Sequence, residues 1–303
     1  MNKDLISGFD LTNEDINKIF KKTKALKKNK YNFILKQKVV ALVFQKPSMR
    51  TRVSFEAGVR QLGGDCIYLA PQDIQLGKRE LIKDVARVMA RYVDLIVART
   101  FSHEHINELA EYAEVSVING LSDLYHPCQA LADIFTIYEK KAGFKGIKLA
   151  YIGDGNNVLN SLLAIAAKVG LSINVATPKG YMPDKKIWQE ACVLGKKNKT
   201  VFTWTQRPEE AIKGADFVYT DVWTSMGQEE ESAQRRRDFK PFQLNSGLIK
   251  KSQKETMIMH CMPMHRDEEI TDEVAESKHS IIIDQAENRL HVQKAVMALL
   301  IKS

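Results

Sequence analysis

Short apolar runs alternate with amphipathic stretches along the whole chain, and this alternation limits the possible folds more than any other feature. The first clear run, Val39–Phe44, has the length and composition of a strand buried on both faces. Downstream, Phe55, Val59 and Leu62 recur at helical spacing, so they share one face of a helix. Strands that alternate with helices form parallel sheets with helices on both sides. The sequence therefore predicts an α/β fold.

The pattern divides the chain into two halves. In the first half we predict strands at 39–44, 66–69, 95–98 and 115–118, and helices at 12–28, 51–62, 80–91, 104–112 and 127–140. In the second half we predict strands at 148–152, 172–176, 201–203, 217–220, 257–260 and 281–283, and a last helix at 286–301. The polar stretch 139–148 is the predicted boundary. We expect two doubly wound parallel-sheet domains, with an active-site cleft between them.

Composition excludes several classes of protein. No apolar stretch approaches the length needed to cross a membrane, and the first residues have no apolar core like that of a secretory signal. The four cysteines are far apart, with no CxxC pair, which favours free thiols in the cytoplasm over disulfides or a zinc site. The net charge of +8 permits nucleic-acid binding, but the basic runs are short and lack interleaved aromatic residues. An anionic small substrate explains the surplus equally well.

The segment Ser48–Arg52 stands where the first predicted strand gives way to a helix. It brings two hydroxyls and two guanidinium groups to a helix N-terminus, where unpaired N–H groups and the helix dipole favour an anion. Arginine adds a planar donor fork that fits phosphate oxygens. The alternative is a serine N-cap followed by solvated arginines. Taken alone, the segment leaves both interpretations open.

Further polar motifs follow the other predicted strands. They are Arg99-Thr100-Phe101, His126-Pro127-Cys128-Gln129, Gly153-Asp154-Gly155-Asn156-Asn157, Asp221–Gly227, His260-Cys261-Met262-Pro263 and Gln285–Arg289. Ligands of parallel α/β sheets bind at the carboxyl ends of strands, so these positions are candidate sites. The Gly153-Asp154-Gly155 turn is not a dinucleotide fingerprint, because Val158 stands where a third glycine is needed. Cys261 lacks a well-placed base for a thiol nucleophile, since neighbours on a strand point to opposite faces.

In this order, the six motifs resemble those of the aspartate/ornithine carbamoyltransferase family, and the resemblance covers the whole chain. It implies that residues 1–140, completed by the helix 286–303, bind carbamoyl phosphate and that residues 141–285 bind ornithine. The implied phosphate contacts are Ser48, Met49, Arg50 and Thr51. The implied contacts to the carbonyl are Arg99, His126, Gln129 and Arg289, which also make up, with Cys261, the implied catalytic set. Arg52 is expected to be structural.

The resemblance also implies the second substrate and the assembly. The implied ornithine contacts are Asn157, Asp221, Ser225, Met226, Cys261 and Met262. Gln75 matches a loop that in this family reaches the active site of a neighbouring subunit, which implies a homotrimer. Three residues depart from the usual pattern, in which threonine stands at Met49, leucine at Met262 and glycine at Asp267.

The expected activity is transfer of the carbamoyl group of carbamoyl phosphate to the δ-amine of L-ornithine, which yields L-citrulline and phosphate without metal or cofactor. The alternatives are a carbamoyltransferase for putrescine or aspartate, and a non-catalytic anion-binding protein with the same fold. The tripeptide Ser225-Met226-Gly227 favours ornithine among the acceptors. Neither a nucleic acid nor a membrane is expected as a partner. The direction of the reaction in the cell and any assembly beyond a trimer remain open at this point.

Overall fold

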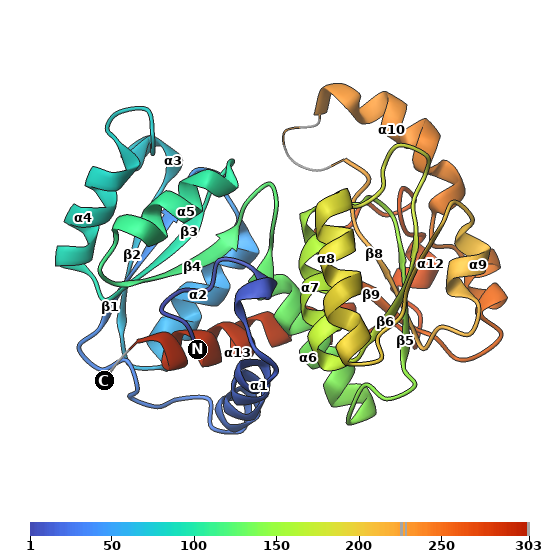
Figure 1. Cartoon of the computed structure of the whole chain (residues 1–303), viewed down its shortest axis with the longest axis horizontal. Coiled ribbons are helices and arrows are strands. Elements are labelled where there is room, and N and C mark those ends of the chain that lie inside the picture. The colour runs from blue at the N-terminus through green and yellow to red at the C-terminus, as the bar shows by residue number, and fades with distance from the viewer. Residues whose placement is uncertain (225–226, 228, 302–303) are drawn as a thin grey trace. The chain divides into compact units, whose positions relative to one another are not determined.

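The computed structural model describes residues 1–224, 227 and 229–301, and the chain divides into two compact units (Figure 1). Unit 1 comprises Met1–Phe135 and Asn288–Ser303, and unit 2 comprises Thr136–Glu287. Two helices, α6 (Pro127–Lys141) and α13 (Ile282–Leu300), begin in one unit and end in the other. Each unit is built on one sheet.

Unit 1 contains a sheet of four parallel strands in the order β2-β1-β3-β4. The strands are β1 (Val39–Phe44), β2 (Asp65–Leu69), β3 (Leu95–Arg99) and β4 (Ser116–Leu121). Four strands were predicted here, and each prediction is confirmed to within three residues at either end. The strand order reverses between β1 and β3, which places the switch point of this doubly wound sheet between their carboxyl ends.

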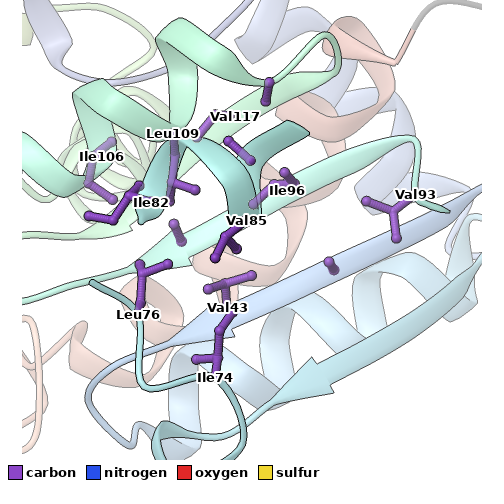
Figure 2. Packing of buried hydrophobic residues seen from close by; sticks show 14 residues of the cluster. Val43, Ile74, Leu76, Ile82, Val85, Val93, Ile96, Ile106, Leu109 and Val117 are labelled. Carbon is purple, nitrogen blue, oxygen red and sulfur yellow. The ribbon is translucent and has the colours of Figure 1, made fainter. Parts of the chain in front are cut away.

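Helices cover both faces of this sheet (Figure 1). They are α1 (Asn13–Lys28), α2 (Met49–Gln61), α3 (Pro71–Ile74), α4 (Ile82–Tyr92), α5 (His103–Tyr112) and the second part of α13. Val43 and Ile96 point to the face covered by α4 and α5, where they pack with Val85 and Leu109 in a buried cluster (Figure 2). On the other face, Gly58 of α2 allows close approach to α13. Burial of both faces explains why β1 and β3 are apolar along nearly their whole length, whereas the edge strand β2 begins with exposed Asp65.

Unit 2 contains a sheet of five parallel strands in the order β7-β6-β5-β8-β9. The strands are β5 (Lys148–Ile152), β6 (Ser172–Ala176), β7 (Phe202–Thr205), β8 (Phe217–Thr220) and β9 (Met257–His260). The helices are α7 (Asn157–Val169), α8 (Lys185–Lys197), α9 (Pro208–Ile212), α10 (Ser232–Phe239), α11 (Ser246–Ile249) and α12 (Asp272–Ala275). The order of the strands reverses between β5 and β8, so this unit has a switch point of its own.

The predicted strand 281–283 is wrong, because helix α13 already begins at Ile282. Ser280 makes a single parallel bridge to Ile258, and Ile281 donates a backbone hydrogen bond to Ile258. After this contact the chain turns into the helix, with Ile282 buried in the core and Ile283 exposed. Three consecutive isoleucines fit a buried strand and a helix start equally well, and their period cannot separate the two.

No helix within the described residues is long and apolar enough to span a lipid bilayer.

Candidate active site

The switch point of unit 1 carries the predicted phosphate segment. Ser48 is the N-cap of α2, and its Oγ accepts a hydrogen bond from the backbone N–H of Thr51 at 3.3 Å. Across the switch point from this segment stands Arg99, at the end of β3. Its carbonyl accepts a hydrogen bond from the backbone N–H of Gln45 at 2.8 Å. The helix therefore begins at the position that the sequence predicted for an anion site, with Arg50 in its first turn.

Arg289 of α13 joins two of the predicted residues. One guanidinium nitrogen donates to Oε1 of Gln129 at 2.6 Å, and the other donates to Oγ1 of Thr51 at 3.2 Å. The Nε2 of Gln129 donates in turn to Oδ1 of Asp133 at 2.8 Å. All four side chains are buried. Residues from three distant segments of the sequence thus form one network, which fixes the guanidinium plane of Arg289.

Arg99 and His126 both lie close enough to Arg289 to feel its positive charge. The register of β3 against β4 shifts between Ala98 and Arg99, an irregularity that often re-aims a side chain next to a functional site. Burial, together with the charges of Arg289 and Arg50, lowers the pKa of Arg99 to about 10. Burial, Arg289 and Arg99 hold the pKa of His126 well below its ordinary value of 6.5, so the imidazole is neutral. Such a cluster suits a multiply charged anion, which would neutralise the mutual repulsion of the guanidinium groups.

The remaining predicted residues of unit 1 are exposed. Met49, the first residue of α2, is 69% exposed, and Gln75 lies on the turn after α3 with a positive φ of 41°. Arg52 makes an ion pair with Glu56 at 2.7 Å, and its guanidinium group lies 3.7 Å from the ring centroid of Tyr68. These contacts agree with the structural role predicted for Arg52.

The switch point of unit 2 carries a buried carboxylate. Asp221 follows β8, and its Oδ2 accepts a hydrogen bond from Nδ2 of Asn156 at 2.7 Å. Its Oδ1 accepts from the backbone N–H of Val222 and from Sγ of Cys261, both at 2.8 Å. Asn156 is also the N-cap of α7 and follows β5. The carboxylate of Asp221 is therefore fixed in place and aimed by donors from three loops.

The ring of His260 lies next to Asp221 and Cys261 and bonds to other partners. Its Nδ1 accepts the backbone N–H of Met262 at 2.8 Å, so Nε2 carries the proton that it donates to Oε1 of buried Glu269 at 3.0 Å. The ligand atoms of Asp221, His260 and Cys261 lie within 4.8 Å of one another. A metal ion would have to break one of the two hydrogen bonds of the imidazole, so this trio does not fit a metal site as it stands.

Several predicted residues of unit 2 have a less defined place. Ser225 and Met226 lie outside the described residues. Asn157 is the first residue of α7, directly after the asparagine that contacts the carboxylate, and Met262 is half-buried with a positive φ of 56°. Asp267 adopts a φ of 66°, the left-handed region in which glycine is usual, and its backbone N–H donates to the carbonyl of Ile270. The turn therefore forms with aspartate in place of glycine.

Two contributions to this site were not predicted from the sequence. Asn156, which precedes the predicted Asn157, donates to Asp221. Asp154, to which no role was assigned, forms a buried ion pair of 2.9 Å with Arg235 of α10. The first could have been found from the place of Asn156 in the motif after β5, since residues that follow neighbouring strands of a parallel sheet meet at one edge. The second joins residues 81 positions apart, and no local signal marks it.

Comparison with known proteins agrees with this geometry. Residues 3–139 match the family model described as the carbamoyl-P binding domain of aspartate/ornithine carbamoyltransferase, and residues 145–300 match the model of its Asp/Orn binding domain. The chain belongs to the aspartate/ornithine carbamoyltransferase family. Both sites lie at the switch points of the two domains that define this family.

Members of the aspartate/ornithine carbamoyltransferase family resemble the chain over nearly its full length. A protein of Pyrococcus horikoshii named ornithine carbamoyltransferase is 50% identical, with coverage of 99% of this chain and 96% of the relative. A protein of Listeria monocytogenes with the same name matches with the same identity and coverage. The solved structure of ornithine carbamoyltransferase from Pyrococcus furiosus superposes with a TM-score of 0.96 at 50% identity, and the match covers 98% of this chain and 96% of that one.

Proposed function

We propose that this protein transfers the carbamoyl group of carbamoyl phosphate to the δ-amine of L-ornithine, and so forms L-citrulline and phosphate. The observation that carries the proposal is the group of arginines around neutral His126 at the unit 1 switch point. It offers charge for a phosphate dianion and neutral donors for a carbonyl oxygen in one place. Relatives that are 50% identical over 99% of the chain and named ornithine carbamoyltransferase support the choice of acceptor.

The first substrate is assigned to unit 1, residues 1–140 with the helix 286–303. The hydroxyls of Ser48 and Thr51, the backbone of Met49 and the guanidinium of Arg50 bind the phosphate at the start of α2. Donors on the carbonyl side stabilise the oxyanion that develops when the amine attacks. These donors come from Arg99, His126, Gln129 and Arg289.

The second substrate is assigned to unit 2, residues 141–285. The carboxylate of Asp221 pairs with the α-ammonium of ornithine. Cys261, whose Sγ donates to Oδ1 of Asp221 at 2.8 Å, is assigned to the same substrate. The substrate carboxylate then needs donors, a role that we assign to Asn157, Ser225 and Met226. Met262 is assigned to contact the aliphatic chain.

The proposed reaction is a direct transfer. The δ-amine must be neutral to attack, and a free alkyl amine has a pKa of about 10. Desolvation beside the positive charge of Arg99 and Arg289 lowers that pKa. The amine nitrogen forms a bond to the carbonyl carbon, the bond from that carbon to the phosphate oxygen breaks, and the departing phosphate takes the proton released by the amine. No cofactor enters this balance, and alignment of two bound substrates is worth roughly 7–11 kcal/mol in comparable reactions.

One assay separates this proposal from its alternatives. The purified protein is given carbamoyl phosphate with ornithine, putrescine or aspartate, and the carbamoylated products are measured. We expect citrulline to be the main product. A preference for either other acceptor would contradict the assignment, and phosphate binding without any product would indicate a non-catalytic protein. Arg50→Ala is expected to abolish saturation by carbamoyl phosphate, whereas undiminished turnover would contradict the phosphate site.

We further propose a cytoplasmic homotrimer in which exposed Gln75 completes the carbamoyl phosphate site of a neighbouring subunit. The four cysteines, all free, support a reducing compartment. Gln75→Ala and Arg99→Ala variants are mixed after mild dissociation and reassociation. If sites are shared, the mixture regains activity that neither variant has alone, and sedimentation gives the mass of three chains. Activity that stays at the level of the two variants would contradict the shared site.

A further inference from the structure

Arg235 of α10 has a buried guanidinium that connects two separate loops of unit 2. One terminal nitrogen donates to Oδ2 of Asp154 at 2.9 Å and to the carbonyl oxygen of Trp223 at 2.8 Å. The Nε donates to Glu231 at 3.0 Å, one helical turn before Arg235. The side chains of Arg235 and Asp154 are only 6% and 8% exposed. Burial of two opposite charges is costly unless each is well bonded, so the pair must be held in a defined geometry.

Both loops that Arg235 contacts support the carboxylate of Asp221. Trp223 stands two residues after Asp221 on the segment that leaves β8. Asp154 stands two residues before Asn156, whose Nδ2 donates to Oδ2 of Asp221 at 2.7 Å. The backbone that carries Asp221 and the side chain that aims it are therefore tied to the same guanidinium group.

The surroundings of Arg235 make this tie rigid. Its guanidinium carbon lies 4.9 Å from the ring centroid of Tyr181, whose hydroxyl donates to Asp238 at 2.9 Å. The carbonyl of Tyr181 accepts the backbone N–H of Gly155 at 2.9 Å. Burial raises the pKa of Asp154, and the charge and hydrogen bond of Arg235 oppose this rise. A lysine could replace the charge but not the planar fork, which bonds Asp154, Trp223 and Glu231 together.

We propose that Arg235, through Asp154 and the carbonyl of Trp223, is a positioning residue that fixes Asp221 for the α-amino acid substrate. The inference rests on the proposed function, in which Asp221 binds the α-ammonium group. Arg235 itself touches no reacting atom. Its effect should therefore fall on the affinity for ornithine and leave the carbamoyl phosphate site of unit 1 unchanged.

The test uses steady-state kinetics of the full-length protein with Arg235→Lys, with the single variants Asp154→Asn and Arg235→Gln, and with the double variant Asp154→Asn/Arg235→Gln. We expect Arg235→Lys to raise the KM for ornithine at least tenfold while the KM for carbamoyl phosphate stays within twofold of the unaltered protein. The double variant carries no unpaired buried charge, so it keeps the fold testable. Because the two residues act as one unit, its ornithine KM should match that of the worse single variant rather than the product of both effects.

Arg237→Gln is the matched control, because it removes an arginine from the same helix. Within the described part of the chain, the guanidinium of Arg237 bonds only exposed Gln234. We expect its kinetic constants to equal those of the unaltered protein. An ornithine KM within twofold of normal in Arg235→Lys and in the double variant would overturn the inference. So would equal rises in the KM of both substrates, which indicate a general loss of structure. If the unaltered protein forms no citrulline, the proposed function fails first, and this inference falls with it.

Discussion

Arg289 donates a hydrogen bond to the hydroxyl of Thr51 at 3.2 Å across 238 positions of sequence. The contact joins the last helix of the chain to the first turn of α2, and both residues lie in unit 1. It gives the hydroxyl of Thr51 an acceptor role toward arginine and leaves its proton available for donation to another group. In the proposed function, Thr51 therefore links Arg289 to the phosphate that binds at the start of α2.

Thr51→Val removes this hydroxyl while it keeps the shape of the side chain. We expect the KM for carbamoyl phosphate to rise about tenfold to a hundredfold, because a hydrogen bond to a charged group is worth about 1.5–3 kcal/mol. The KM for ornithine should change little. Ser54→Ala is the control, since among the described residues that hydroxyl bonds only the carbonyl of Thr51. Equal kinetics of Thr51→Val and the control would show that the hydroxyl has no part in binding.

His126 predicts a measurable pH dependence of stability. Its pKa in the folded protein lies well below the ordinary 6.5, because of burial and the charges of Arg289 and Arg99. Below pH 6.5 the unfolded chain therefore binds a proton that the folded chain does not, and stability falls as the pH falls. The loss can reach about 1.4 kcal/mol per pH unit from this one group. Urea unfolding at several pH values between 5 and 7.5 should show a steeper loss for the unaltered protein than for His126→Gln. Parallel curves would contradict the shift.

The sequence was sufficient to predict the fold because both units follow one rule. Interior strands such as β1 and β3 are buried apolar runs, as is typical of strands inside a parallel sheet. The edge strands β2 and β7 contain polar residues and are less buried. The one predicted strand that failed, 281–283, is an apolar run whose length and composition suit two structures. It makes a single bridge at Ser280, and the helix begins at Ile282.

The place of a candidate residue in the fold was predictable where the residue stands next to its own strand, and a contact was unpredictable where the partner comes from far away. Arg99 and Asp221 were selected because each stands at the end of a strand. The role of Arg235 was not foreseeable, since its partner Asp154 lies on another loop and neither residue has a local pattern that marks a buried ion pair. Asn156 and Asn157 are chemically identical, and only the backbone conformation of the cap decides which one faces Asp221.

Gly155 is required by a close approach of two backbone segments. A Cβ at this position would lie 2.3 Å from the carbonyl carbon of Met182 and from the nitrogen of Pro183, both of them backbone atoms. Gly155→Ala must therefore displace one loop, and we expect a loss of several kcal/mol in the free energy of unfolding. Chemical denaturation measures the loss. Gly143→Ala, where nothing lies within 4 Å of the added carbon, should leave stability nearly unchanged. Similar stability of the two variants would contradict the predicted clash.

Cys261 donates its thiol proton to Asp221 at 2.8 Å, so its donor capacity can be tested apart from its size. Cys261→Ser keeps a donor, and we expect an ornithine KM within about threefold of normal. Cys261→Ala leaves the carboxylate with one donor fewer, which costs roughly 1.5–3 kcal/mol when the acceptor is charged and so raises the ornithine KM more than tenfold. Kinetics with ornithine as the varied substrate compare the two. A serine variant as weak as the alanine variant would show that the sulfur itself, and not the hydrogen bond, matters.

Lys294 gives a second pH-dependent contribution, at higher pH than that of His126. Its fully buried ammonium donates to the carbonyl of Lys30 at 2.6 Å and to Oε1 of Gln61 at 2.9 Å, and burial lowers its pKa to about 8. Between about pH 8 and 10.5 the unfolded chain holds a proton that the folded chain has lost, so stability from this group rises with pH.

The rise attributable to Lys294 can reach about 3 kcal/mol across this window, since one pKa unit corresponds to about 1.4 kcal/mol. Lys294→Met has no proton to exchange, so unfolding curves at pH 7.5 and pH 10 should differ less for it than for the unaltered protein. Lys30→Met keeps the backbone carbonyl that Lys294 bonds but removes a repelling charge, which shifts the window to higher pH. If Lys294→Met gains as much stability between the two pH values as the unaltered protein does, the buried ammonium is not the group that titrates.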